Sequence, residues 1–161
     1  MKDYLYYLVI VLFLLMPSYV FGGNVGIPRQ SNALDQFYHA METFYFPASK
    51  ATGDDRKKLA KQAAEALATV WEYFPDCKSQ LILMEAYYYQ GMCYVELKES
   101  KKAMEAFYSC FSNKNIPAVA TNDYEADMMS YKNDAWYALM ELREYLPPEY
   151  LNYVNLYKPS P

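Results

Sequence analysis

The chain has 161 residues, enough for one domain, and 53% of them are hydrophobic, enough to bury a core. Aromatic residues make up 18%, with 19 tyrosines and only 5 glycines, a composition typical of a tightly packed helical protein and not of a disordered one. The net charge of -4 and the pI near 5.0 argue against nucleic-acid binding, because phosphate binding needs a clustered basic face. The basic runs Arg56–Lys61 and Lys98–Lys102 are typical of solvated helix starts or turns.

The N-terminal residues 1–22 have the layout of a secretory signal peptide. A basic start is followed by the apolar run Tyr4–Met16, then Pro17, then small residues before a break after Gly22. An uncleaved membrane anchor is the alternative, because residues 4–21 are almost long enough to span a bilayer, but Pro17 interrupts the run and favours cleavage. No cysteine near the break offers a lipid anchor. We therefore expect an exported protein, periplasmic or secreted, that is soluble or peripherally attached.

Two helices are expected after a flexible lead over residues 23–30. Ser31 or Asn32 caps the first helix, which ends before Pro47 because the residue before a proline disfavours helical geometry. Its aromatic face carries Leu34, Phe37, Tyr38, Met41, Phe44 and Tyr45. A loop over 47–53 follows, and Asp54 and Asp55 open the second helix. Its apolar positions at helical spacing are Leu59, Ala63, Leu67, Val70 and Phe74.

The central segment 84–117 is predicted to form two helices that fold against each other. Tyr87, Gly91 and Tyr94 recur at i, i+4 and i+7, and Ala103, Phe107 and Cys110 repeat that spacing. A turn at Leu97–Ser100 joins them, with Ser100 as the cap of the second helix. Small residues at 91 and 103 are expected to let the two backbones approach closely. Glycine lowers helix propensity, so a packing role explains its presence at 91.

The last part of the chain predicts a loop, a long helix and a short one. Asn122 with Glu125 three residues later forms a capping box after a loop over 113–121. The apolar face of the long helix carries Tyr124, Met128, Tyr131, Ala135, Leu139, Leu142 and Leu146. Pro147 ends it, and Pro148 can occupy the first turn of a short helix through Tyr157, before the tail 158–161.

The central segment resembles a tetratricopeptide repeat, a 34-residue helix-turn-helix unit. Tyr87, Gly91, Tyr94, Ala103 and Phe107 match its signature positions. The departures are a glutamine at 90, where the family has leucine, a cysteine at 110, where it has alanine, and a late proline at 117. Over residues 57–112 the repeat pattern is similar to that of periplasmic tetratricopeptide proteins of Gram-negative envelopes, such as those of β-barrel assembly and the Tol-Pal system. The resemblance implies an all-α fold over 31–157: a short antiparallel stack of helical hairpins, about five helices in a right-handed solenoid.

Side chains that could carry chemistry are few. Cys77, Cys93 and Cys110 form no CxxC motif, and three cysteines cannot all pair within one chain. Cys93 and Cys110 lie on the two helices of one repeat and could meet, but buried free thiols are favoured. The single histidine, His39, is more typical of an ordinary helix residue than of a base or ligand. We find no nucleophile, phosphate-loop or metal motif, so neither an enzyme nor a cofactor is predicted.

The resemblance also implies a ligand surface, because the first helix of such repeats lines a concave groove. The groove positions correspond here to Glu85, Tyr88, Met92, Val95 and Glu96. They would make an aromatic, soft and acidic surface suited to a peptide with apolar or basic anchors. The alternative is that Tyr88 and Met92 are covered by neighbouring helices as core, since a short stack leaves little room for an open groove.

Two functions follow as hypotheses. One is an exported, non-enzymatic adaptor that binds a protein or peptide in the cell envelope. The other is an accessory subunit fixed permanently in a larger envelope or secretion complex, which we expect to aggregate without its partner. Aromatic residues on the end helices, such as Tyr45 and Trp136, are candidates for a homodimer or partner contact. An enzymatic role would depend on His39 and a few acids alone.

Overall fold

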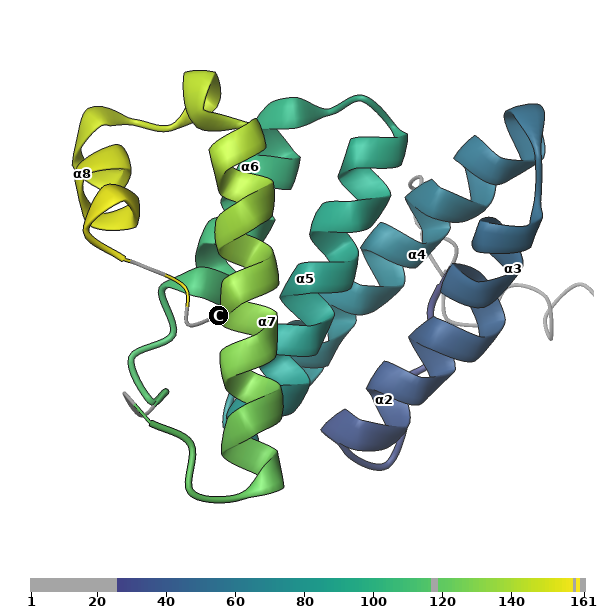
Figure 1. Cartoon of the computed structure of the whole chain (residues 1–161). Helices are drawn as coiled ribbons and strands as arrows, with labels where there is room; N and C mark the ends of the chain where they lie inside the picture. The colour runs from purple at the N-terminus through teal and green to yellow at the C-terminus, as the bar shows by residue number, and fades with distance from the viewer. Residues whose placement is uncertain (1–25, 117–118, 158, 160–161) are drawn as a thin grey trace, which may run out of the picture.

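The computed structural model describes residues 26–116, 119–157 and 159, and this part of the chain is an all-helical stack, which confirms the predicted fold class. Six helices pack against one another there when the continuous segment 33–50 is counted as one (Figure 1). The predicted signal peptide, residues 1–22, and the proline at 117 lie outside the described residues. Within those residues, no helix is both long enough and apolar enough to cross a membrane.

The first helix is longer than the sequence predicted. It consists of α2 (Ala33–Ala40), a π-helical turn η1 (Met41–Tyr45) and α3 (Phe46–Lys50), and the side chain of Asn32 caps it as expected. The prediction that it ends before Pro47 is wrong. Proline lacks an N–H and crowds the carbonyl four residues earlier, but the wider π turn just before Pro47 accommodates both effects.

Residues 26–30 lie against the helices, although the sequence predicted a flexible lead there. Ile27 is buried, and its carbonyl accepts a hydrogen bond of 3.0 Å from the Tyr73 hydroxyl. The backbone N–H of Gln30 donates to the buried Gln36 side chain at 2.8 Å, and Gln36 donates in turn to Thr69 at 2.8 Å. These polar contacts fix the lead because each buried group finds a partner.

Helix α4 (Gly53–Tyr73) lies between the first helix and α5 (Gln80–Glu96). The predicted core positions Ala63, Leu67 and Val70 are fully buried. Gln90 of α5, the departure from the repeat's leucine, donates a buried hydrogen bond of 3.1 Å to the Ala64 carbonyl of α4. The amide therefore ties two helices together at a position where the family pattern would have an apolar contact.

α5 and α6 (Ser100–Phe111) form the predicted hairpin, but one local expectation is wrong. Ser100 makes no capping hydrogen bond, because it is already the first residue of α6 and Glu99 occupies the cap position. Gly91 has the predicted packing role: a Cβ built there would lie 2.6 Å from the nearest atom of the buried Phe107 ring. The glycine thus makes room for the ring of Phe107.

Helix α7 (Asp123–Glu141) begins at the predicted capping box. Asn122 accepts from the backbone N–H of Glu125 at 2.9 Å, and the Glu125 carboxylate accepts from the backbone N–H and hydroxyl of Thr121. The helix ends at Glu141 and not at Pro147. A 3₁₀ turn, η2 (Arg143–Tyr145), follows, and α8 (Pro148–Leu156) begins at its proline as expected.

Two buried clusters meet at α5. The first lies among helix 33–50, α4 and α5 around Phe37 and Leu67, and the second lies among α5, α6, α7 and α8 around Phe107 and Leu139. α5 supplies residues to both clusters, and Tyr94 contacts both. α5 is therefore the central helix, and in Figure 1 it lies between α7 on one side and the first helix on the other.

Candidate functional site

One side of α5 remains uncovered by α4 and α6. The buried residues of α5 are Met84, Ala86, Gln90, Gly91 and Cys93. The five predicted site residues lie between them, at i, i+3, i+7, i+10 and i+11 from residue 85, and so share the other side of the helix. The Met92 and Val95 side chains are 39% and 48% exposed, and the other three are partly exposed. The structure therefore places the predicted site residues on one accessible stripe.

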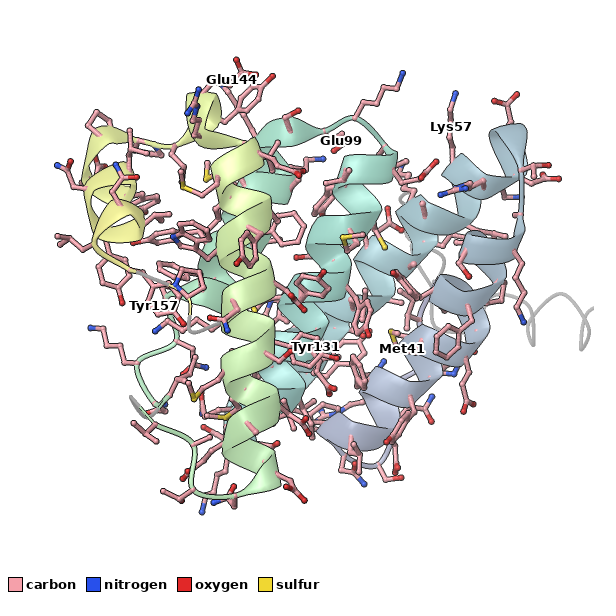
Figure 2. The ribbon with its side chains drawn as sticks, viewed as in Figure 1. Met41, Lys57, Glu99, Tyr131, Glu144 and Tyr157 are labelled. Carbon is pink, nitrogen blue, oxygen red and sulfur yellow. The ribbon has the colours of Figure 1, made fainter. Side chains whose placement is uncertain are left out.

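Four half-buried tyrosines cross this side of the molecule from three helices, and we call them the tyrosine surface: Tyr45, Tyr88, Tyr89 and Tyr131. Ring centroids are 4.9 Å apart for Tyr45 and Tyr89, 5.6 Å for Tyr88 and Tyr89, and 5.5 Å for Tyr88 and Tyr131. These pairs meet edge to face, the arrangement that ring quadrupoles favour. Figure 2 shows Tyr131 on the side of α7 that faces α5.

The two alternatives for Tyr88 and Met92 have different outcomes. Tyr88 packs on the buried Phe107, with centroids 5.7 Å apart, and on Tyr131, so part of its ring is core. Met92 is exposed and lies at the edge of a small cavity. A substitution at Tyr88 would therefore disturb folding, whereas a substitution at Met92 tests the surface alone.

That cavity lies at the end of the tyrosine surface and has a volume of about 90 Å³. Its lining includes Tyr45, Met92, Arg56, Glu96 and Cys93, from three helices. Arg56 and Glu96 form an ion pair of 2.6 Å across it. Burial raises the pKa of the Cys93 thiol to about 12, so this cysteine stays protonated and is a poor nucleophile at neutral pH.

The carboxyl groups of the site are not equivalent. Glu96 is neutralised by Arg56, but Glu85 has no such partner among the described residues. Burial raises the pKa of Glu85, a hydrogen bond with Tyr131 opposes the rise, and the charge of Asp127 adds to it. Asp134 of α7 contributes to a raised pKa of Tyr88, whose main cause is burial. The tyrosine surface thus carries acidic groups that form no ion pair with other described residues.

Other reactive side chains make no second site. His39 lies 3.2 Å from the Thr43 hydroxyl through Nδ1 and meets Phe44 edge-on. The three cysteines are free thiols, with Cys93 and Cys110 in separate buried clusters. In the ranges that the structure describes, no group of three His, Cys, Asp or Glu side chains is placed to hold a metal ion.

Sequence reasoning missed Tyr89, Asp127 and Asp134 as parts of this surface and counted Tyr131 as core. The run of tyrosines at 87–89 was the available signal for Tyr89, because three successive helical residues point in directions about 100° apart and cannot all be buried on one side. The two aspartates had no local signal, since only packing of α7 beside α5 brings them near.

Of the two end-helix aromatic residues, only Tyr45 joins the candidate site. Trp136 is half-buried beneath α8, where its indole N–H donates to the Val154 carbonyl at 2.9 Å.

Comparison with known proteins identifies no relative: no protein-family model, curated protein or solved structure matches the chain. The tetratricopeptide resemblance therefore remains a prediction that rests on the spacing of the residues in the central hairpin.

Proposed function

We propose that the chain is an exported, non-enzymatic adaptor of the tetratricopeptide type that binds a partner protein through the uncovered side of α5. The observation that carries this proposal is the exposure of Met92 and Val95 beside the tyrosine surface. α5 is the central helix, so its exposed apolar side chains lie in the middle of the helical stack, beside the tyrosine surface, and not at an end of the stack.

The chemistry of this surface suits protein recognition better than catalysis. Tyrosine and methionine supply large contact areas, tyrosine at a low cost in conformational entropy and methionine with an adaptable shape. The cavity at its end has a volume of about 90 Å³, too small to enclose a typical organic substrate. Location in the cell envelope depends on the sequence of residues 1–22 and is part of the proposal.

The test is capture of the partner by site-specific photo-crosslinking. A photo-reactive phenylalanine analogue is placed at Met92 of the tagged chain, and covalent products are recovered from gently solubilised envelopes. A Met92→Glu, Val95→Glu double variant serves for affinity purification, and Leu156→Glu is its matched control, because Leu156 is an apolar residue 83% exposed on α8.

We expect one partner to be crosslinked at 92, lost from the double variant and retained by the control. If the same partner is recovered equally with both variants, the α5 surface is not the binding site and the proposal is wrong. A chain that stays folded in isolation supports an adaptor, whereas aggregation of the isolated chain would favour the permanent subunit.

A further inference from the structure

Three carboxyl groups at the tyrosine surface form no ion pair with any of the residues that the structure describes. The ion pairs of the described residues join Arg56 to Glu96, Lys57 to Asp54 and Lys102 to Glu99. None of them includes Glu85, Asp127 or Asp134. Glu85 lies on α5, and Asp127 and Asp134 lie on α7, which packs against α5. Glu85 is one helical turn before Tyr88, and Asp134 is one turn after Tyr131, and the rings of these two tyrosines meet with centroids 5.5 Å apart.

The tyrosine surface also lacks the cations that cover other aromatic rings of this protein. Arg29 lies over Phe74 at 5.0 Å, and Lys102 lies over Tyr94 at 5.3 Å. Lys132 lies over Phe111 at 5.4 Å and over Tyr157 at 4.9 Å. In the described part of the chain, no lysine or arginine lies over any ring of the tyrosine surface. Four rings elsewhere in the described residues thus have an internal cation over them, whereas the four rings of the tyrosine surface have none.

The carboxyl groups without an ion pair and the aromatic rings without a cation lie in the same place. A positive charge beside the Tyr88 and Tyr131 rings would gain from both ring quadrupoles and from the carboxylates of Glu85 and Asp134. Glu85 pays for burial without a counter-charge, as its raised pKa shows, so a cation supplied from outside would remove a cost that the free protein carries.

We infer that the tyrosine surface binds an arginine side chain of an extended segment in the partner protein, with the guanidinium at Tyr88, Tyr131, Glu85 and Asp134. This inference rests on the proposed function and names the chemistry of its ligand. Arginine fits better than lysine because its planar guanidinium stacks on aromatic rings and bridges carboxylates.

The same geometry gives the spacing of the segment. From Glu85 to Met92, and from Tyr88 to Val95, α5 advances seven residues, or about 10 Å at the rise of an α-helix. An extended chain covers this distance in about three residues. The recognised segment therefore carries an arginine and, three positions away, an apolar residue that contacts Met92 and Val95.

The probes are blocked hexapeptides that contain Arg-Ser-Ser-Leu or Leu-Ser-Ser-Arg, each paired with a peptide in which citrulline replaces arginine. Citrulline has nearly the same shape but no charge. Peptides are titrated into the ¹⁵N-labelled chain, and amide shifts in α5 and α7 give the affinity. The variants are Glu85→Gln with Asp134→Asn, and Glu144→Gln as the control, an exposed acid that Figure 2 shows away from Tyr131.

We expect one arginine peptide to bind about three- to thirtyfold more tightly than its citrulline partner, with shifts in α5 and α7. The preference should disappear in the Glu85→Gln, Asp134→Asn variant and persist in Glu144→Gln. Equal binding of both peptides at α5 overturns the inference and leaves the adaptor proposal standing. Absence of shifts in α5 and α7 at the highest peptide concentration also overturns it. The adaptor proposal itself fails only in the crosslinking and capture experiment above.

Discussion

α5 and α6 pack through a small residue against a large one, whereas α8 is attached to its neighbours by large aromatic side chains. In the first case the Phe107 ring occupies the place that a side chain at Gly91 would take. In the second, Tyr108 and Tyr150 stack with centroids 3.9 Å apart and ring planes within 8°. Both contacts bury aromatic area, but only the first depends on the absence of a single methyl group.

The attachment of α8 has several other parts. Phe111 meets Tyr153 at 5.4 Å and Tyr157 at 5.2 Å, and the Tyr157 hydroxyl donates to the Asn133 side chain at 2.6 Å. Each of these contacts is modest on its own and can be lost without a clash. The comparison indicates that the central hairpin is intolerant of change at one point, whereas the α8 contact is spread over many points and should weaken gradually.

The largest expected effect is that of Gly91→Ala. Helix propensity alone predicts a gain of about 1 kcal/mol for this change. The added Cβ would lie 2.6–2.8 Å from three atoms of the Phe107 ring, which is fully buried, so the ring or the backbone must shift. We therefore expect a net loss of about 1–3 kcal/mol in the free energy of unfolding, measured by urea denaturation.

A double-mutant cycle tests the cause. Phe107→Leu, although destabilising alone, should remove most of the clash, so that Gly91→Ala costs less in that background than in the native chain. If Gly91→Ala stabilises the native chain, the close contact between Gly91 and Phe107 is not as tight as described.

The sequence predicted the helices well because their signals are local. The spacing of Gly91, Phe107 and their neighbours specifies the hairpin, and Asn122 specifies the start of α7 through its cap. The continuation of the first helix through Pro47 was missed, because the π turn that permits it has no clear sequence signature. The sequence did not predict that α7 ends at Glu141 and that the 3₁₀ turn η2 follows it, because Leu142 and Leu146 continue the apolar periodicity of α7.

The candidate site was predictable in part. The tetratricopeptide resemblance implied the positions from Glu85 to Glu96, and the period of a helix puts these positions on one side of α5. The partners on α7, Tyr131 and Asp134, depend on how two helices lie beside each other, which is a tertiary fact. The pairing of Glu96 with Arg56, 40 residues earlier, was equally inaccessible.

A middle-sized effect is expected at α8 from Trp136→Phe. The change keeps an aromatic ring but removes the indole N–H that donates to the Val154 carbonyl at 2.9 Å. We expect a loss of about 1 kcal/mol, because the change removes the hydrogen bond that joins α7 to the Val154 carbonyl, which keeps only the backbone N–H of Tyr157 as a donor, at 3.2 Å. Amide hydrogen exchange should become faster in α8 and unchanged in α5 if α8 opens separately.

Tyr137→Phe is the matched control, since Tyr137 is the adjacent residue of α7 and is exposed. It should change neither stability nor exchange. Equal acceleration of exchange in α5 and α8 by Trp136→Phe would show that the two regions open together and would contradict the comparison.

The smallest effect, and the one that joins stability to function, is expected at Glu85. Burial raises the pKa of Glu85, so the folded chain holds this proton more tightly than the unfolded chain does. The carboxyl therefore lowers stability as pH rises from the ordinary glutamate range toward neutrality. Glu85→Gln should leave stability nearly unchanged near pH 4 and raise it at pH 7, by less than the Trp136→Phe loss. Glu144→Gln, at an exposed acid, is the matched control.

Urea denaturation of the variants at both pH values measures this difference, and a destabilised Glu85→Gln at pH 7 would contradict it. The same substitution is expected to weaken the preference for arginine over citrulline. Glu85 would then lower the stability of the free protein and also distinguish one ligand from another. A binding site combines these two properties because a charge that complements a partner stays unpaired until the partner binds. The side of α5 that carries Gly91 would then serve folding, and the side that carries Glu85 would serve recognition.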